Sequence, residues 1–445
     1  MKKAIIIFTR VPIPGKTKTR MMPTLTPAQC EHLHTCFLKD IRRVCEQCAA
    51  DIYVCYTPDE EKYKRQIMDI LGTEKNYFPQ KGNDLGNRMC NAFEEVLKKE
   101  YDSCLLIGTD VPELQTSCLM KAFEVLDKKD VVFGKTVDGG YYLVGMKKLY
   151  PQVFGLEQYG HSSVFYETLK RLQAESIRVG YTEELLDMDT PSDLQKYRNH
   201  MRENNRLYKT ETGKYVSEIA KISIIIPVYN EEKLIVPLQR QLSSLKEQCE
   251  IILVDGGSTD KTQTLIEPGY RVISAEKGRA NQMNQGALES TGDILFFLHC
   301  DSELPENVLG EIRTVMREYR AGCFGIAFRS KSPLMFICRV ISNYRVKDRK
   351  VMFGDQGMFM ERELFFELGM FPQIPIMEDY QLSLTLKEAG IKLGMANKRI
   401  YTSDRRYPRG MIPKLRLMWK MNRMRKMYRD KVQVQKLADM YEDIR

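Results

Sequence analysis

The sequence predicts an α/β protein built from two domains that follow each other along the chain. Each half opens with a β-branched run, AIIIF at 4–8 and ISIIIPVY at 222–229, which meets a loop and then a helical stretch. Strand-like and helix-like segments then alternate in both halves, a pattern typical of sheets with parallel strands. The 445 residues are about two to three times the length of an ordinary domain, so each half can bury its own core.

The boundary between the domains is predicted in a polar stretch near the middle of the chain. Residues 201–218, MRENNRLYKTETGKYVSE, have little apolar periodicity, whereas buried-strand patterns lie on both sides of them. We therefore expect domains at 1–200 and 219–445, joined by a linker at 201–218.

Short apolar runs predict the strands, and longer amphipathic stretches predict the helices. In the first half, strands are expected at 4–8, 51–56, 103–108 and 130–134, and helices at 27–48 and 84–99. In the second half, strands are expected at 222–227, 249–254, 270–274, 293–298 and 323–328, and helices near 231–247, 279–290, 304–318 and 378–390. Because sheets of this class bind ligands beyond the carboxyl ends of their strands, the polar residues that directly follow strands are the site candidates.

The composition is that of an ordinary soluble protein. With 43% hydrophobic and 29% charged residues, no apolar run approaches the roughly 18 residues that a membrane-spanning helix needs. The apolar stretch near the start ends at Arg10 and is too short for a secretory signal. We therefore expect a cytoplasmic protein.

Twelve cysteines lie scattered through apolar segments, which is typical of reduced core residues. Cys45 and Cys48 form the single C-x-x-C, and a helix explains them better than a metal site. The net charge of +9 is compatible with anionic small substrates, an acidic membrane surface or nucleic acid, and does not choose among them.

Four motifs of the second half follow one another at strand ends and helix starts: KISIIIPVYNEE, IILVDGGSTDKT, KGRANQMNQGA and GDILFFLHCDSELP. Their order resembles a family 2 glycosyltransferase of the GT-A fold over about residues 221–410. Within that family the sequence is most similar to the radical-SAM/selenodomain-associated transferases, also named arsenosugar-biosynthesis glycosyltransferases, in which this domain can be fused to a second transferase-like one. The resemblance implies two tandem GT-A, Rossmann-like domains of the nucleotide-diphospho-sugar transferase type.

The resemblance also implies a divalent cation, Mn²⁺ or Mg²⁺, that neutralises the nucleoside diphosphate leaving group. Asp301 follows a very apolar strand and is its carboxylate candidate, with the capping of the next helix as the alternative. The usual D-x-D motif reads His299-Cys300-Asp301 here, so a histidine replaces the first carboxylate, and an imidazole suits Mn²⁺ better than Mg²⁺.

On the same resemblance, the residues that bind the UDP part of the donor come from several of these motifs. A helix that begins with an arginine is suited to a diphosphate or to sugar hydroxyls, and Asn281 and Asn284 on that helix are equally well explained as structural. The implied donor-binding residues of these motifs are Pro227, Tyr229, Glu231, Asp255, Gly278 and Arg279. The segment GDQGMF at 354–359 resembles the lining of the acceptor and sugar pocket, and it adds Asp355 and Gln356 to the donor-binding set.

Glu378 and Asp379 open a predicted amphipathic helix. An acidic pair there also suits the helix dipole, which is the alternative explanation. The resemblance implies that Asp379 is the catalytic base of an inverting transfer, with Glu378 in support.

The tail is strongly basic, with thirteen Lys or Arg between 398 and 431 against two Asp. Its interleaved Leu, Met, Trp and Tyr fit either a helix on an anionic membrane surface or a solvated basic face, while no fold for nucleic-acid recognition accompanies the charge. Arg405 and Arg406 are further candidates for the diphosphate.

The first half carries a glycine and three cations after its first strand, Gly15, Lys16, Lys18 and Arg20, a set suited to a triphosphate although the P-loop spacing is absent. With DGGYYLVG and LLDMDTPSDL, this half resembles the companion domain of the same fusion family and, more distantly, guanylyltransferases of coenzyme F420 and molybdenum-cofactor synthesis. The resemblance implies that Asp110 and Asp189 share Mg²⁺ and that Gly139 and Gly140 allow close approach of a ligand. A retained fold without activity, with the two aspartates as turn and cap residues, is the equal alternative.

Three functions are therefore open. The first is a bifunctional enzyme whose second domain transfers a sugar from a UDP-sugar to an unknown hydroxylated acceptor. The second is a nucleotide-sugar sensor or scaffold without turnover. The third is a transferase peripheral to the inner face of the membrane, acting on a lipid or isoprenoid acceptor.

Overall fold

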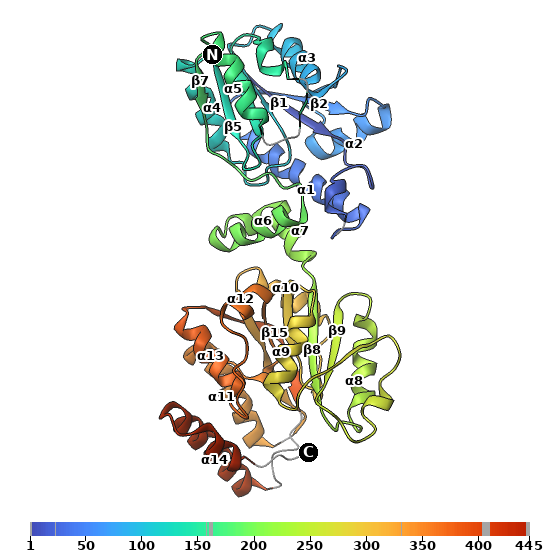
Figure 1. Cartoon of the computed structure of the whole chain (residues 1–445), viewed down its shortest axis with the longest axis vertical. Coiled ribbons are helices and arrows are strands. Elements are labelled where there is room, and N and C mark those ends of the chain that lie inside the picture. Colours follow the sequence, from blue (N-terminus) through green and yellow to red (C-terminus); the bar gives the residue numbers. More distant parts are fainter. Residues whose placement is uncertain are drawn as a thin grey trace. The chain divides into compact units, whose positions relative to one another are not determined.

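The computed structural model of the protein describes residues 2–22, 24–156, 158–159, 163–330, 332–402 and 410–441. The chain divides into two compact units, Met1–Val216 and Ser217–Arg445 (Figure 1). Each unit is an α/β domain, as the sequence predicts, and its sheet is mixed rather than all parallel.

The first unit is built on a seven-stranded sheet in the order β3-β2-β1-β4-β6-β5-β7. Strand β6 runs antiparallel to its neighbours β4 and β5, while the other strand pairs are parallel. The strands are β1 (Lys3–Arg10), β2 (Asp51–Thr57), β3 (Asn76–Pro79), β4 (Ser103–Ile107), β5 (Val131–Lys135), β6 (Tyr141–Met146) and β7 (Val179–Tyr181).

Helices cover both faces of this sheet because its central strand is apolar on both sides. In β1, Ile5 and Ile7 pack into one core layer and Ala4 and Ile6 into the other, as the two-residue period of a strand requires. The helices are α1 (Pro27–Glu46), α2 (Glu61–Leu71), α3 (Leu85–Leu97), α4 (Thr116–Lys128), α5 (Val164–Ala174), α6 (Pro191–Glu203) and α7 (Glu211–Glu218), with short 3₁₀ turns at Thr19–Met21, Pro151–Phe154 and Leu207–Lys209.

The second unit has an eight-stranded sheet in the order β10-β9-β8-β11-β14-β13-β15-β12. Again one inner strand, β14, runs antiparallel to both of its neighbours. The strands are β8 (Ile222–Val228), β9 (Glu250–Asp255), β10 (Arg271–Ser274), β11 (Ile294–Phe297), β12 (Ser302–Glu303), β13 (Ala321–Phe328), β14 (Met358–Glu361) and β15 (Leu393–Thr402).

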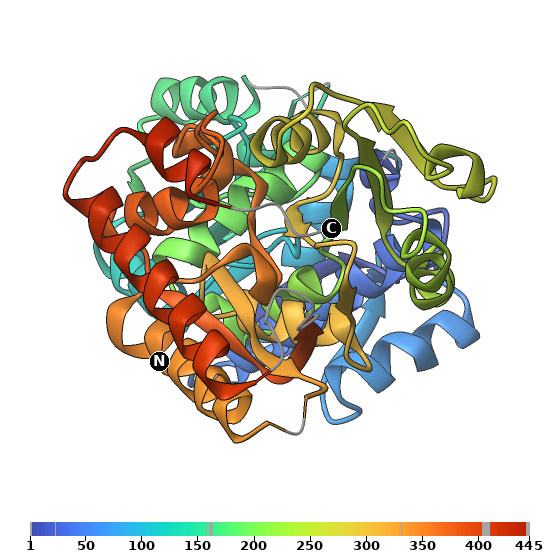
Figure 2. The ribbon, with the colours of Figure 1, turned by 90° about the horizontal axis from the view of Figure 1, so that it is seen from below.

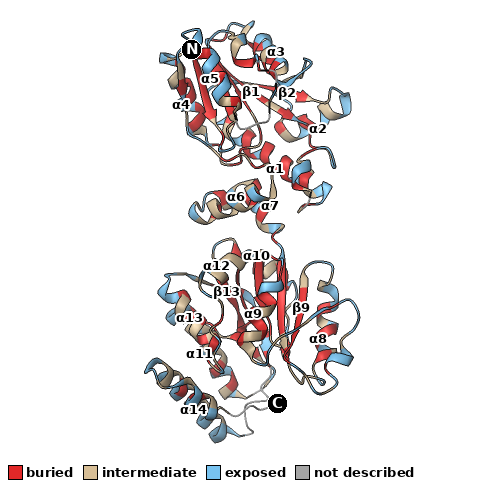
Figure 3. Ribbon diagram, viewed as in Figure 1, coloured by how far each residue is buried: buried red, intermediate tan, exposed pale blue. Residues whose placement is uncertain are grey.

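The second sheet is also buried between two apolar layers, shown in red in Figure 3. Ile224 and Ile226 face the layer that contains α8 and α10, and Ile225 faces the layer that contains α9 and α13. The helices are α8 (Ile235–Leu242), α9 (Arg279–Glu289), α10 (Val308–Met316), α11 (Pro333–Arg349), α12 (Arg362–Glu367), α13 (Glu378–Glu388), α14 (Met411–Arg429) and α15 (Val434–Asp439), with 3₁₀ turns at Ser243–Leu245, Gln263–Leu265 and Gly354–Gln356.

The two sheets share one topology. When the strands of the second unit are renumbered from β8, with the two-residue β12 left aside, both sheets read 3-2-1-4-6-5-7, and the sixth strand is the antiparallel one in each. The sixth strand of each sheet, at Tyr141–Met146 and Met358–Glu361, was not predicted. The first segment lies in DGGYYLVG and the second follows Asp355 and Gln356, and both stretches were interpreted as ligand-binding loops.

Residues 201–218, expected to be a linker, contain the end of α6, a 3₁₀ turn and α7, and up to Val216 they belong to the first unit. The contact that holds α7 comes from Asp40 of α1. Its carboxylate oxygens accept hydrogen bonds from the backbone N–H groups of Glu211 and Thr212, at 2.8 Å each. Asp40 thus caps the N-terminus of a helix about 170 residues away in sequence.

Two further expectations concern cysteines and membrane spans. All twelve cysteines are free thiols, and most are buried, as expected. Among the described residues, no helix is both long and apolar enough to span a bilayer.

The cap of α7 gives a first prediction. Asp40→Ala leaves two buried N–H groups without their acceptor, so we expect the free energy of unfolding of the first unit to fall by about 1–3 kcal/mol. Urea denaturation of the full chain, followed by far-UV circular dichroism, measures this loss. The matched control is Asp127→Ala, which removes an exposed aspartate from α4. Equal stability of the two variants would contradict the cap.

Candidate active site

The candidate residues of the second unit gather at one edge of its sheet. Strands β8, β9 and β11 are parallel, so their carboxyl ends meet there, with Asp255 ending β9 and His299 and Asp301 following β11. Strand β14 runs the other way and therefore begins at the same edge, which places Asp355 and Gln356 beside the others. The expected convergence of these motifs is thus present in the fold.

The Asp255 carboxylate is engaged by its own loop. It accepts hydrogen bonds from the N–H groups of Gly257 (2.9 Å) and Ser258 (3.0 Å), from the Ser258 hydroxyl (2.6 Å) and from the Gln263 amide (2.5 Å). Burial alone would raise the pKa of this carboxyl, but the hydrogen bonds outweigh burial and lower it. In this arrangement Asp255 shapes the loop at the end of β9.

The loop after β8 is fastened to the loop after β9. The N–H of Asn230 donates to the Ser258 hydroxyl at 2.9 Å, and the N–H of Glu231 donates to the Thr262 hydroxyl at 2.7 Å. Pro227, Tyr229 and Glu231 are half-buried in this region. The Lys277 ammonium lies 4.6 Å from the centre of the Tyr229 ring, which links the loop to the start of α9.

Helix α9 is held against the sheet by Gln282, a residue that the sequence analysis did not single out. Its buried side-chain amide donates to the backbone carbonyls of Val228 (2.8 Å) and Val254 (2.7 Å), which lie at the ends of β8 and β9. Gly278 precedes the helix with φ of 140°, a conformation that favours glycine. Asn284 exchanges hydrogen bonds with the backbone of Phe371, so its role is structural.

The start of α9 meets the start of α13. Arg279 is the first residue of α9 and Glu378 is the first residue of α13, and their charged groups are 3.4 Å apart. Burial would lower the pKa of the Arg279 guanidinium, but Glu378 and further partners outweigh burial and raise it. A diphosphate candidate and a member of the acidic pair are therefore direct neighbours.

Asp379 lies with His299 around Gly354. One oxygen of the Asp379 carboxylate accepts the N–H of Gly354 at 2.9 Å, and the other accepts the N–H of Tyr380 at 2.7 Å. A Cβ at Gly354 would lie 2.8 Å from Nε2 of His299 and 3.4 Å from the Asp379 carboxylate. Only glycine fits at 354, and the absence of a side chain there lets the imidazole and the carboxylate approach each other.

Gln356 is buried next to this group. Its side-chain oxygen accepts the N–H of Phe353 at 3.2 Å, while its Nε2 has no hydrogen-bond partner within the described part of the chain. A buried amide donor of this kind is costly unless a ligand or water pairs with it. Asp355 is half-buried beside it, and Arg405 and Arg406 lie outside the described residues.

A divalent cation fits the second unit only together with a ligand. Among the described residues, no group of three or more His, Cys, Asp or Glu side chains is arranged to hold an ion. Asp301 and His299 are half-buried at the sheet edge and supply an oxygen and a nitrogen donor, a set that suits Mn²⁺ when phosphate oxygens and water complete the coordination.

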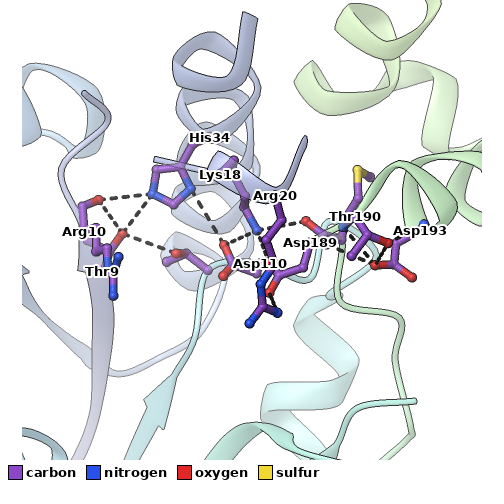
Figure 4. A network of polar contacts seen from close by, with 11 residues as sticks. Thr9, Arg10, Lys18, Arg20, His34, Asp110, Asp189, Thr190 and Asp193 are labelled. Carbon is purple, nitrogen blue, oxygen red and sulfur yellow. Dashed lines mark hydrogen bonds and ion pairs between the residues drawn. The ribbon is translucent and has the colours of Figure 1, made fainter. Parts of the chain in front are cut away.

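In the first unit, the two aspartates assigned to Mg²⁺ share a lysine instead (Figure 4). The Lys18 ammonium lies 2.7 Å from the Asp110 carboxylate and 2.7 Å from the Asp189 carboxylate, and it also donates to the Met188 carbonyl at 2.8 Å. The Lys18 side chain is only 4% exposed; its ammonium donates hydrogen bonds to Asp189 and to the Met188 carbonyl and forms an ion pair with Asp110. The cation between the carboxylates is therefore Lys18.

The backbone holds this cluster together. The N–H of Met188 donates to the Asp110 carbonyl at 2.8 Å, which joins the segments after β4 and β7. Burial would lower the pKa of Lys18, but the two carboxylates outweigh burial and raise it. His34 lies 3.7 Å from Asp110, and burial lowers its pKa to about 4, so its imidazole is neutral at pH 7.

The other candidates of the first unit surround this cluster less closely. Lys16 is exposed, and Arg20 is largely exposed at 3.8 Å from Asp189. Gly15 has φ of 77° with open space around it, and Gly139 and Gly140 form the turn between β5 and β6 at the same edge of the sheet.

Two acidic residues of this edge, Asp138 and Asp187, were not among the candidate site residues predicted from the sequence. Burial, together with the charges of Asp138 and Asp189, raises the pKa of Asp187 to about 6. The D-x-D pattern at 187–189 was the available signal.

Two family matches agree with this division of the chain. Residues 40–161 match the family described as "Uncharacterized protein conserved in bacteria (DUF2064)", and residues 223–367 match "Glycosyl transferase family 2". These segments fall within the first and the second unit, respectively.

Curated relatives match over about a third of their own length. The undecaprenyl-phosphate 4-deoxy-4-formamido-L-arabinose transferases of Enterobacter sp. (strain 638) and Yersinia enterocolitica (serotype O:8 / biotype 1B) are both 32% identical, over 103 and 114 residues. These stretches make up 20% and 23% of this chain and 32% and 35% of the two relatives. Among solved structures, a protein described as a nucleotide-diphospho-sugar transferase from Desulfovibrio desulfuricans G20 is 28% identical, with a TM-score of 0.47, over 49% of this chain and 95% of its own.

The family 2 match covers the strands β8 to β14, and thus the sheet edge at which the donor-site candidates meet. The chain therefore joins a segment that matches DUF2064 to a segment that matches glycosyl transferase family 2, each within an α/β unit of the same topology.

Proposed function

We propose that the second unit transfers a sugar from a UDP-sugar to a hydroxylated acceptor, with inversion at the anomeric carbon and with a divalent cation. The observation that carries the proposal is the meeting of α9 and α13 at the sheet edge. It places the Arg279–Glu378 ion pair and the Asp379 carboxylate together beside His299.

Asp379 is the proposed catalytic base. Two backbone N–H groups hold its carboxylate in one orientation, and each oxygen has a second lone pair beyond the one that accepts the N–H. When an acceptor hydroxyl attacks the anomeric carbon, one of these lone pairs takes its proton while the bond from that carbon to the diphosphate breaks.

Arg279 is the proposed diphosphate contact. Its position at the N-terminus of α9 adds the positive end of a helix dipole to its own charge. Glu378 is buried and lies 3.4 Å from the guanidinium, so its proposed role is to position Arg279. The unpaired Nε2 of Gln356 is the proposed donor of a hydrogen bond to the sugar or the acceptor.

Asp301 and His299 are the proposed metal-holding residues of this unit. A bound Mn²⁺ or Mg²⁺ would neutralise the charge that develops on the diphosphate as it leaves. Asp301 lies in the turn between the apolar strand β11 and the two-residue strand β12, so the sheet holds the chain on both sides of it.

The arrangement in the first unit does not fit a metal ion shared by Asp110 and Asp189, because Lys18 occupies the position between them. We propose that this unit is a ligand-binding domain whose exposed cations are Arg20 and Lys16, with Lys18 fixing the two aspartates beside them. The alternative is a nucleotidyltransferase, which would release pyrophosphate from a nucleoside triphosphate and a sugar phosphate.

The donor and metal assignments are tested by UDP release. Full-length protein is incubated with a panel of UDP-sugars and Mn²⁺, Mg²⁺ or a chelator. We expect one donor to support metal-dependent release, and we expect Asp301→Ala to slow it by about two orders of magnitude. Glu306→Ala, which removes an exposed carboxylate from the next loop, is the control. Release that is unaffected by the chelator or by Asp301→Ala would remove the metal site.

The base is tested by Asp379→Asn, which keeps the shape of the side chain and one of its two acceptor oxygens. Since a general base contributes about 10²- to 10⁴-fold to the rate, we expect kcat to fall by that factor, with UDP binding unchanged. UDP binding is followed by thermal shift, and Glu388→Gln at the exposed end of α13 is the control. A wild-type kcat in Asp379→Asn would transfer the role to another residue.

The role of Lys18 is tested by Lys18→Met, which removes the ammonium but keeps an unbranched side chain. Two neighbouring carboxylates without a cation then repel each other and form an acidic pair that suits Mn²⁺. We expect the variant to be less stable than the wild type and to gain a Mn²⁺ site, seen by electron paramagnetic resonance. The site should be lost again in Lys18→Met/Asp110→Asn. The opposite result would be that the wild type binds Mn²⁺ without nucleotide and that Asp110→Asn abolishes this binding. Lys18 would then be displaced by the metal ion.

A further inference from the structure

Helices α11 and α14 carry an unusual concentration of exposed apolar side chains. Of the 18 exposed large apolar side chains among the described residues, nine lie on these two helices. They are Phe336, Ile337, Val340, Ile341 and Tyr344 on α11, and Met411, Ile412, Leu415 and Trp419 on α14. Trp419 and Met411 are each 65% exposed. In Figure 3, α14 is almost entirely pale blue and tan.

The spacing places each set on one side of its helix. On α11 the exposed positions follow i, i+1, i+4, i+5 and i+8, and on α14 they follow i, i+1, i+4 and i+8, both with the period of an amphipathic helix. The opposite sides pack inward, through Met335 and Val346 on α11 and Met424 on α14. The apolar rows therefore point away from the body of the unit.

The two helices are neighbours. The Cys338 sulfur of α11 is 3.2 Å from the Met418 sulfur of α14, and both views of the ribbon show α14, in red, beside α11 (Figures 1 and 2). We call the nine exposed side chains, together with the cations of the two helices, the α11–α14 face.

The charge on this face is strongly positive. Helix α14 contains seven Lys or Arg and no acidic residue, and α11 contains four Lys or Arg and one Asp. Arginines also lie against the exposed aromatic rings: Arg339 is 4.4 Å from the centre of the Phe336 ring, and Arg423 is 5.5 Å from the Trp419 ring. Apolar and aromatic residues rimmed by cations are the composition of helices that lie in the interface of an anionic bilayer.

We propose that the α11–α14 face docks the protein on an anionic lipid surface. A second copy of the chain is the other candidate for an apolar face. In a two-fold dimer each patch meets itself, so the seven cations of α14 would face the same seven cations, which opposes pairing. Anionic headgroups supply the opposite charge, and the acyl boundary accepts the apolar rows.

The face is directly connected to the candidate base. The last turns of α14 pack against α13, where the Tyr428 hydroxyl donates to Gln381 at 2.7 Å and Arg429 donates to the Tyr380 hydroxyl at 2.9 Å. Tyr380 follows Asp379 in the chain. An acceptor presented by the bilayer, such as a polyprenyl phosphate, would thus reach a docked catalytic unit. This last step rests on the proposed function, whereas the docking does not.

The experiment uses Trp419, which is the single tryptophan of the chain. Full-length protein without donor is mixed with vesicles of phosphatidylcholine containing phosphatidylglycerol, or of phosphatidylcholine alone. We expect co-sedimentation with the anionic vesicles and a shift of tryptophan emission to shorter wavelength, both weakened by high salt. We expect Ile337→Ser/Ile341→Ser on α11 and Ile412→Ser/Leu415→Ser on α14 each to reduce partitioning at least tenfold.

The control variant is Met120→Ser/Tyr166→Ser, which removes exposed apolar side chains from the first unit and should bind like wild type. Thermal unfolding verifies that every variant is folded. The proposal is overturned if folded wild type shows neither co-sedimentation nor an emission shift, or if both face variants bind anionic vesicles like the control. It is also overturned if sedimentation velocity shows self-association without lipid that the face variants abolish. UDP release is measured separately, so a failure of the glycosyltransferase assignment leaves the vesicle result intact.

Discussion

The geometry of the second unit depends on one side-chain amide. Strands β8 and β9 end at the site with the carbonyls of Val254 and of Val228, the latter also accepting the N–H of Gly256 at 3.0 Å. Gln282 satisfies both with its single NH₂ group and thereby fixes α9 over the two strand ends. Gly286 permits this approach, because a Cβ there would lie 2.4 Å from Ile225. The position of Arg279, and through it the pairing with Glu378, follows from this attachment.

The two units have the same topology but differ in the charged residues that surround the aspartate at the sheet edge. Both sheets bring an aspartate to the edge after the fourth strand, Asp110 in the first unit and Asp301 in the second. In the first unit a buried lysine from the loop after the first strand neutralises this aspartate together with Asp189. In the second unit the corresponding loop after the first strand contributes Tyr229 and Glu231, an aromatic and an acidic residue, to the same edge. The difference lies in the loops, and the sheets are alike.

The features that could be predicted from the sequence are those that depend on the local pattern of apolar and polar residues. The α/β class, the strands β1, β2, β4, β8, β9 and β11, and the convergence of polar residues at their carboxyl ends follow from hydrophobic period and chain direction alone. Contacts that a distant residue decides could not be predicted in this way. The residues next to Asp110 in the sequence do not predict its ion pair with Lys18, and those next to Asp40 do not predict that it caps α7. The exposed apolar side chains of α11 were not predicted for a related reason. From sequence alone, an apolar helix is expected to be buried in the core, and only the structure shows that this side of the helix is exposed.

The cap of α7 has a consequence for the order in which the chain can be completed. During synthesis the buried carboxylate of Asp40 emerges long before Glu211 and Thr212, whose amide groups are its partners. This cap therefore cannot form until the chain has been synthesised as far as α7, which ends only a few residues before β8 begins. Since the second sheet repeats the strand order of the first, the contact completes the first unit just before the strands of a second, similar folding unit follow.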